Sequence, residues 1–192
     1  MLGRPLVLLQ PGNRRTLRWN GVRQADDDDK SWPAQRWAEL ARAISYRLPQ
    51  AQILFCGSPA EAAYLNTVLA VCDTKSLRID AAALPISRLK ALLETAHSMV
   101  SVDTGPAHLA AAVGCPLVVL FGARPPLMWA PRSASGSSVA VVGGLPGQRV
   151  DDIETAQAMT AWRSLPPRAC TAASADRPAA VKATDQSAGC AG

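Results

Sequence analysis

Short apolar runs alternate with longer segments of helical periodicity along most of this 192-residue chain, and this alternation constrains its fold most strongly. The runs are continuous, as is typical of strands buried on both faces of a parallel sheet. The predicted strands, in chain order, are residues 5–10, 51–57, 76–80, 98–103, 115–122 and 137–144. Because strands alternating with helices build parallel sheets, the sequence predicts an α/β fold with a doubly wound parallel sheet.

Four predicted helices lie between the first five strands, and a fifth follows the last strand. Their ranges are 32–48, 58–72, 84–96, 104–114 and 150–165. In the first helix, Ser31 is expected to cap the N-terminus, with Pro33 tolerated in the first turn. The third helix is expected to turn four apolar residues inward: Ile86, Leu89, Leu92 and Leu93.

Composition places the chain among folded cytoplasmic proteins. A hydrophobic content of 48% and a charged content of 18% fit a globular core. No apolar run approaches the about 18 residues that cross a bilayer. The five cysteines form no CxxC pair and have no histidine at metal spacing, which suits a reducing compartment and argues against zinc. We therefore expect one domain over residues 1–165 and a disordered, Ala-, Ser- and Thr-rich tail over 166–192.

Ligands of such sheets bind beyond the carboxyl ends of the strands, in the loops that lead into the helices. This rule selects four segments, namely residues 10–30, 57–61, 103–108 and 122–129. The first contains a cluster of arginines, which could meet phosphate, anionic lipid or nucleic acid or could form a solvated loop. Functional residues are expected in these four segments.

The segment SVDTGPAHLAAAVGCPLVVLFG (101–122) carries the most information. Asp103 ends a strand, and the Thr104 hydroxyl can cap the helix that follows. Gly105 lets a ligand approach the backbone, Pro106 occupies the first turn, and His108 lies one turn in. The first-turn amides and the positive end of the helix dipole favour an anion here. A capped structural helix with a surface histidine explains the same residues, and spacing alone leaves both interpretations open.

At this point the sequence resembles a known family. The pattern Asp-Thr-Gly-Pro-x-His-Leu-Ala-Ala-Ala-x-Gly-x-Pro, followed by an apolar strand and Phe-Gly, is similar to the hallmark of the heptosyltransferases, glycosyltransferase family 9. Upstream, Lys30 precedes Trp-Pro as in the family's Lys-x-Trp-Pro helix start, and GSPAE (57–61) resembles its Gly-x-Pro-x-Glu turn. The resemblance runs in the same order from residue 5 to about 160. It implies a Rossmann-like domain similar to the C-terminal, donor-binding half of a GT-B glycosyltransferase.

The run DDDDK (26–30) also matches an engineered protease-cleavage linker. Such a linker would be expected at a chain terminus, whereas this run lies inside the α/β pattern. Because Asp-Lys-x-Trp-Pro belongs to the family pattern, we interpret the run as native sequence.

The resemblance implies two donor contacts outside the 101–122 segment. Lys30 is implied to contact the phosphates or the sugar, and a lysine beside a helix N-terminus makes most sense with a polyanion between them. Glu61 is implied to bind the nucleoside through its ribose hydroxyls. A glutamate that merely favours the dipole of its own helix explains Glu61 as well, so this position keeps two interpretations.

Within the hallmark segment, Asp103 is implied to hold sugar hydroxyls, and Thr104, Gly105 and His108 to surround the diphosphate. Leu84 could line the base, although the alignment is loose there. The implied reaction is an inverting displacement at the anomeric carbon, in which these groups and Lys30 stabilise the leaving phosphate. The sequence has no DxD-type carboxylate pair, so we predict a metal-independent enzyme without a cofactor. The donor would be a nucleotide sugar, with ADP-heptose as the family default, and the acceptor a lipid or oligosaccharide of the lipopolysaccharide type.

The chain also departs from the family. Its first strand begins at Pro5, so the N-terminal acceptor domain and its general base are expected to be absent, and no residue here is assigned a catalytic role. A separate chain could supply that half. The exposed face toward it should then be apolar or basic and should favour self-association. The expected location is cytoplasmic, with a peripheral position on the inner membrane as an option.

Two alternatives to a glycosyltransferase half follow from that departure, a non-catalytic nucleotide-sugar-binding module and a truncated pseudo-enzyme. A dinucleotide enzyme is disfavoured because LQPGNRRT stands where G-x-G-x-x-G would follow the first strand. Nucleic acid is not an expected partner, since the arginine cluster lacks interleaved aromatic residues and a recognised module.

Overall fold

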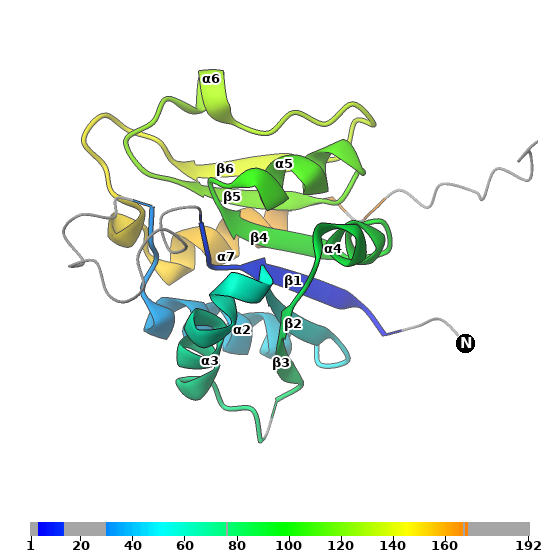
Figure 1. Cartoon of the computed structure of the whole chain (residues 1–192). Helices are drawn as coiled ribbons and strands as arrows, with labels where there is room; N and C mark the ends of the chain where they lie inside the picture. Colours follow the sequence, from blue (N-terminus) through cyan, green and yellow to red (C-terminus); the bar gives the residue numbers. More distant parts are fainter. Residues whose placement is uncertain (1–3, 14–29, 76, 167, 169–192) are drawn as a thin grey trace, which may run out of the picture.

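Six strands form one parallel sheet in the computed structural model, which describes residues 4–13, 30–75, 77–166 and 168 (Figure 1). Their order across the sheet is β3-β2-β1-β4-β5-β6, and every neighbouring pair is parallel. The bounds are β1 Leu6–Gln10, β2 Gln52–Gly57, β3 Ile79–Ala83, β4 Ser98–Val102, β5 Leu117–Phe121 and β6 Val139–Gly143. This order confirms the predicted Rossmann-like, doubly wound sheet.

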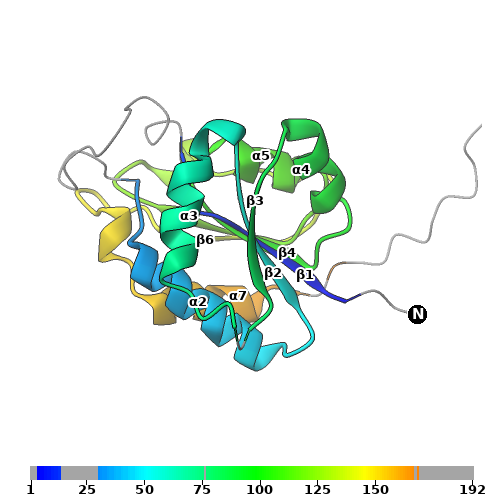
Figure 2. The same ribbon diagram turned by 60° about the horizontal axis from the view of Figure 1, so that its bottom comes forward.

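Helices cover both faces of the sheet. The bounds are α2 Ala34–Arg47, η2 Pro59–Glu61, α3 Ala62–Ala70, α4 Ile86–Leu93, α5 Gly105–Ala112, α6 Pro126–Trp129, η3 Val150–Asp152 and α7 Thr155–Ser164. Figure 2 shows α2 and α7 on one side of the sheet and α4 and α5 on the other. Among the described helices, none combines the length and apolar character that crossing a bilayer requires.

The core consists of two apolar clusters, one on each face of the sheet. Successive strand residues point to opposite faces, so Val7 and Leu9 of β1 join the cluster under α2 and α7, whereas Leu8 joins the cluster under α4 and α5. The central strands β4 and β5 are buried along their whole length. Two-sided burial explains why these strands are continuous apolar runs.

Three local predictions are wrong. The third strand lies at Ile79–Ala83 instead of 76–80, because pairing with β2 starts at Ile79 and outweighs the low strand propensity of the alanines. Helix α2 begins after Pro33, and no side chain caps it, so Ser31 is not its N-cap. Ile86 is 64% exposed as the first residue of α4, so it does not join the buried face that Leu89 and Leu93 form.

Arg168 is described beyond the last helix. Its guanidinium donates to the carbonyl oxygens of Leu93 at 2.7 Å, Ala96 at 2.9 Å and Val113 at 3.1 Å. These carbonyls end α4 and α5, where a cation satisfies acceptors that the helices leave open. Residues 169–192, most of the tail predicted to be disordered, lie outside the described residues, as does the arginine cluster of the first loop.

The strand order places a switch point between β1 and β4, where successive connections leave toward opposite faces of the sheet. The chain that leaves β1 and the turn that follows β4 at Asp103 lie side by side here, since Gln10 and Ser101 are register partners. A ligand crevice is expected at this point, between the two connections.

Candidate functional site

Helix α5 begins immediately beyond β4 and presents its N-terminus at the switch point. Thr104 is the residue before the helix, with an extended backbone of φ −156° and ψ 165°, but its hydroxyl does not make the predicted capping bond. Pro106 has no N–H, and the first amides of a helix lack acceptors within it. The N-terminus of α5 at Gly105 thus lies where the sequence predicted it, Thr104 contributes its backbone position and not a cap, and anion binding here stays a prediction.

We call the region around the N-terminus of α5, at residues 103–108, the opening. Lys30 lies at this opening, although it is 73 residues from Asp103 in sequence. Its ammonium donates to Asp103 Oδ2 and lies 3.5 Å from the carbonyl oxygen of Asp103. The two side chains are 16% and 11% exposed, so the pair is largely withdrawn from water. The predicted proximity of Lys30 to the α5 N-terminus is thus observed. The sequence did not indicate that the Asp103 carboxylate is itself the counter-ion.

Glu61 lies behind the opening, between the ends of β1 and β2. Only 5% of it is exposed, and Oε2 accepts a hydrogen bond of 2.7 Å from the amide of Ser58. A Cβ atom at Gly12 would lie 2.0 Å from Glu61 Oε1, so only glycine allows this close approach. A Cβ atom at Gly57 would also be crowded, at 3.2 Å from Glu61 Cβ. The carboxylate therefore supports the turn after β2, and its predicted nucleoside contact remains a prediction.

Among the described residues, few contacts are seen on the side of the opening that His108 and Gly105 form. His108 is exposed on α5, and a Cβ atom at Gly105 would meet nothing within 4 Å among the described residues. The open space at Gly105 shows that packing within the described structure does not require a glycine there. Leu84 lies further along the same edge, where its amide donates to Gly57 at 2.7 Å.

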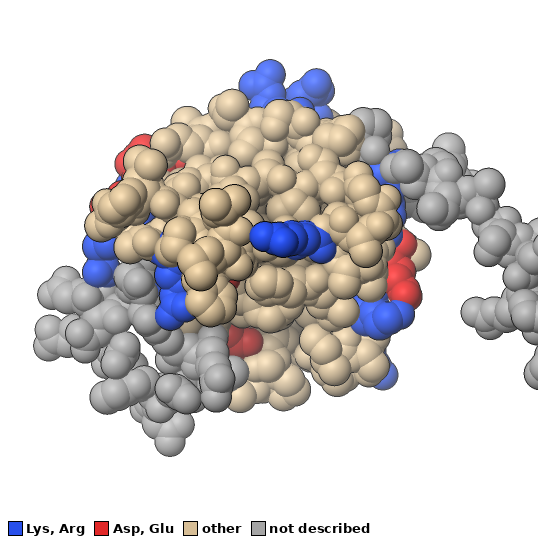
Figure 3. All heavy atoms as spheres, turned by 90° about the horizontal axis from the view of Figure 1, so that it is seen from above, with Lys and Arg blue, Asp and Glu red and all other residues tan. Residues whose placement is uncertain are grey.

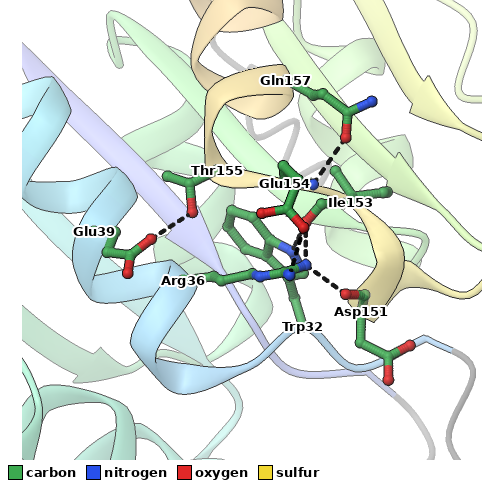
Figure 4. Close-up of polar contacts among 8 residues, drawn as sticks. All are labelled: Trp32, Arg36, Glu39, Asp151, Ile153, Glu154, Thr155 and Gln157. Carbon is green, nitrogen blue, oxygen red and sulfur yellow. Dashed lines mark hydrogen bonds and ion pairs between the residues drawn. The ribbon is translucent and has the colours of Figure 1, made fainter.

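A polar network at the start of α2 fixes the chain next to Lys30 (Figure 4). Trp32 is 1% exposed, its Nε1 donates to Ile153 O at 2.8 Å, and its ring meets Trp37 edge-on at 5.0 Å. Trp32 lies two residues from Lys30, so it anchors the backbone from which the lysine extends. The sequence marked this tryptophan only as a helix start.

Arg36 and Glu39 extend the same network to α7. The Arg36 guanidinium donates to the carbonyl oxygens of Asp151 and Ile153 and bonds Glu154 Oε1 at 2.8 Å. Thr155 Oγ1 donates to Glu39 at 2.8 Å. Partners more than 110 residues apart are joined here, and periodicity within single helices carries no signal for such contacts.

The segment that follows Asp103 contains basic but no acidic residues. From Thr104 to Val150 the sequence contains no Asp or Glu, while it contains three arginines and His108. Figure 3, which looks down from the side of α6, shows mostly uncharged residues with separate Lys and Arg side chains and few carboxylates. This segment therefore adds no carboxylate of its own, although Asp103, directly before it, carries one.

Exposed apolar side chains occur in the connections that leave β5 and β6. They are Leu127 (85% exposed), Met128 (72%), Trp129 (48%) and Leu145 (66%). A Cβ atom at Gly144 would clash with Pro126, so the two connections pack against each other. The predicted apolar or basic character of the face toward the other half and its self-association both stay predictions.

The described cysteines are unsuited to nucleophilic catalysis. Burial raises the pKa of Cys56 to about 12 and the pKa of Cys115 to about 12, the latter partly offset by the charge of Arg168. Burial also raises the pKa of Cys72. A thiolate is the reactive form, so these groups are inert near neutral pH. Within the described ranges, no three His, Cys, Asp or Glu side chains gather as metal ligands.

The sheet order and the helix N-terminus at its switch point define a Rossmann-like α/β domain of the kind that GT-B glycosyltransferases contain. The family follows from sequence. The family described as glycosyltransferase family 9 (heptosyltransferase) matches residues 21–154, and the chain belongs to this family.

Individual relatives are only partly covered. Lipopolysaccharide heptosyltransferase 3 from Escherichia coli is 27% identical over 132 residues, which are 69% of this chain and 35% of the relative. The structure of E. coli ADP-heptose LPS heptosyltransferase II aligns with a TM-score of 0.66 and 24% identity over 85% of this chain and 46% of that one. E. coli heptosyltransferase WaaC with ADP aligns with a TM-score of 0.58 and 21% identity, covering 80% and 42%. The chain thus spans about a third of the curated relative and under half of the solved structures.

Proposed function

We propose that this chain is the donor-binding half of a lipopolysaccharide heptosyltransferase. One observation carries the proposal: Lys30, anchored through Trp32, places its ammonium at the N-terminus of α5 beside Asp103. A cation and a helix N-terminus converging on one opening are suited to a diphosphate, whose charge both stabilise. Family membership supplies the reaction class.

Each site residue has a role in this proposal. Lys30 and the Gly105 amide bind the diphosphate, with Thr104 positioning the backbone and His108 donating a hydrogen bond from the exposed side of α5. Asp103 accepts hydrogen bonds from hydroxyls of the transferred sugar. Glu61, held between β1 and β2, lies deeper along the same edge and is assigned to the nucleoside.

The proposed reaction is an inverting displacement. A hydroxyl of the acceptor attacks the anomeric carbon, the bond from that carbon to the diphosphate oxygen breaks, and a base on the acceptor-binding half takes the hydroxyl proton. Negative charge grows on the leaving diphosphate, where Lys30 and the helix N-terminus stabilise it without a metal. With a lipid-linked acceptor, the reaction would take place at the cytoplasmic face of the inner membrane.

The nucleotide follows from the relatives. One solved heptosyltransferase structure contains ADP and another enzyme is named for ADP-heptose, so ADP and ADP-heptose are the first ligands to test. Isothermal titration with ADP, UDP and GDP should show binding, strongest for ADP. Lys30→Ala should weaken ADP binding about tenfold or more, because a charge-assisted contact is lost. His108→Ala should weaken it less.

A matched control is available on α4. Lys90 forms an exposed ion pair with Glu94, so Lys90→Ala removes one positive charge far from the switch point and should leave ADP binding unchanged. Unchanged ADP affinity in both Lys30→Ala and His108→Ala would show that the diphosphate site is placed wrongly.

A further inference from the structure

The ion pair between Lys30 and Asp103 occupies the place where the diphosphate is expected. Lys30 Nζ contacts Asp103 twice, through carboxylate Oδ2 and the backbone carbonyl oxygen. Both side chains are largely shielded from water, and a shielded pair interacts more strongly than an exposed one. The anion that pairs with Lys30 beside the α5 N-terminus is therefore a side chain of the protein, the Asp103 carboxylate.

Two anions cannot share this position without cost. A diphosphate at the α5 N-terminus would need the Lys30 ammonium that Asp103 holds, and its charge would repel the carboxylate across a short distance. Either the ion pair between Lys30 and Asp103 breaks when the diphosphate binds, or the diphosphate binds beside the intact pair and is repelled by the carboxylate.

Resting on the proposed function, we propose that Asp103 is an internal competitor of the diphosphate and sets the preference for nucleotide sugar over free nucleoside diphosphate. When the donor binds, Lys30 moves from the Asp103 carboxylate to the phosphates, and the freed carboxylate accepts hydrogen bonds from the sugar. After transfer the sugar has left, the terminal phosphate carries an additional negative charge, and Asp103 has lost its hydrogen-bond donors. Re-forming the ion pair with Lys30 then favours release of the nucleoside diphosphate.

The sign of one substitution distinguishes this role from a simple binding role. Asp103→Asn keeps the shape and the backbone carbonyl but removes the competing charge. A residue that only contributes to binding would lower ADP affinity when substituted. Substituting an internal competitor raises the ADP affinity. We expect an increase of about tenfold, within the usual range for coupled sites.

A double-mutant cycle isolates the ion pair from plain repulsion. Affinity for ADP is measured by isothermal titration for wild type, Asp103→Asn, Lys30→Met and the double variant. Repulsion between carboxylate and phosphate is present whether or not Lys30 is, whereas competition requires the lysine. The gain from Asp103→Asn should therefore be several-fold larger with Lys30 present than in the Lys30→Met background. Equal gains in both backgrounds, or no gain with Lys30 present, would overturn the proposal.

Two further measurements keep the outcome clear. Asp103→Ser, with folding of each variant checked by thermal unfolding, should raise ADP affinity in the same direction as Asp103→Asn. Titration with ADP-heptose should show that the ratio of donor affinity to ADP affinity falls in Asp103→Asn. Wild-type chain that binds no nucleotide at all contradicts the proposed function and this inference together. Binding with an additive cycle contradicts the inference alone.

Discussion

Two regions meet at Lys30, and they are built differently. On one side, the junction of α2 and α7 buries Trp32 and joins it to Ile153 and Trp37. On the other side, the opening of α5 has an exposed His108 and a Gly105 with open space around it. The first region is defined by contacts within the protein, whereas the second has few with the part of the chain that the structure describes.

The difference separates stability from binding. Substitutions in the junction remove buried area and satisfied hydrogen bonds, so they should lower the free energy of unfolding. Substitutions in the opening remove little internal contact and should act on ligand affinity. Substitutions in the junction should therefore change stability, whereas substitutions in the opening should change ligand affinity.

The largest expected effect is on stability, from Trp32→Ala. Removing this indole leaves a cavity and removes one of the two hydrogen bonds to the Ile153 carbonyl oxygen, and should lower the free energy of unfolding by about 3–5 kcal/mol. Urea denaturation measures this. Trp129→Ala is the matched control, because Trp129 is 48% exposed and contacts Arg124 only as a cation–π pair at 5.5 Å. The control should lose less than about 1 kcal/mol, and equal losses would contradict the contrast.

A smaller loss is expected from Arg36→Met, which keeps the aliphatic stem but removes the guanidinium bonds to Asp151, Ile153 and Glu154. Part of this contact is exposed, so the expected loss is about 1–2 kcal/mol. Arg42→Met, on the exposed surface of the same helix, serves as control in the same denaturation experiment. If the two variants unfold at the same denaturant concentration, the network does not stabilise the junction.

Gly105→Ala should raise the free energy of unfolding and lower the affinity for ADP. Alanine favours the helix over glycine, and the structure has room for its Cβ, so stability should rise by up to about 0.5–1 kcal/mol. The added methyl group stands where the diphosphate is proposed to approach, so ADP affinity should fall several-fold. Thermal unfolding and titration on one sample measure both. A variant that is more stable and binds ADP as wild type does would argue against close approach at Gly105.

The smallest expected effect is a pH dependence at His97. Burial lowers the pKa of His97 from its ordinary 6.5, and Nδ1 lies 3.0 Å from Ser98 Oγ, which accepts from Trp162 Nε1 at 2.9 Å. Protonation is then easier in the unfolded chain, so the stability associated with neutral His97 is present above about pH 6.5 and lost as pH falls through the lowered value. In His97→Gln, the free energy of unfolding should fall less between neutral and mildly acidic pH. If wild type and His97→Gln show the same dependence of unfolding free energy on pH, His97 does not cause this pH dependence.

Sequence patterns predicted the strands and helix starts that depend on residues close together in the chain. Continuous apolar runs located β4 and β5 because both are buried on two faces, and the Asp-Thr-Gly-Pro-x-His pattern located the start of α5. The exposed Ile86 was predicted wrongly, because helical spacing says which residues share a face but not where the sheet below ends.

Contacts between distant segments were beyond reach of the pattern. Trp32 and Ile153 are 121 residues apart, and neither residue type reveals the other as its partner. Lys30 and Asp103 were both selected as candidates, yet both were assigned to a ligand. Their pairing with each other depends on the tertiary fold that brings residue 30 to the end of β4, and no local propensity encodes that arrangement.

A crystal structure of this chain with ADP tests the central claim most directly. We predict the diphosphate at the N-terminus of α5, with phosphate oxygens within about 2.7–3.2 Å of Lys30 Nζ and the Gly105 amide, and the Asp103 carboxylate released from the lysine. ADP bound away from α5, or bound while Lys30 stays on Asp103 and touches no phosphate, would contradict it.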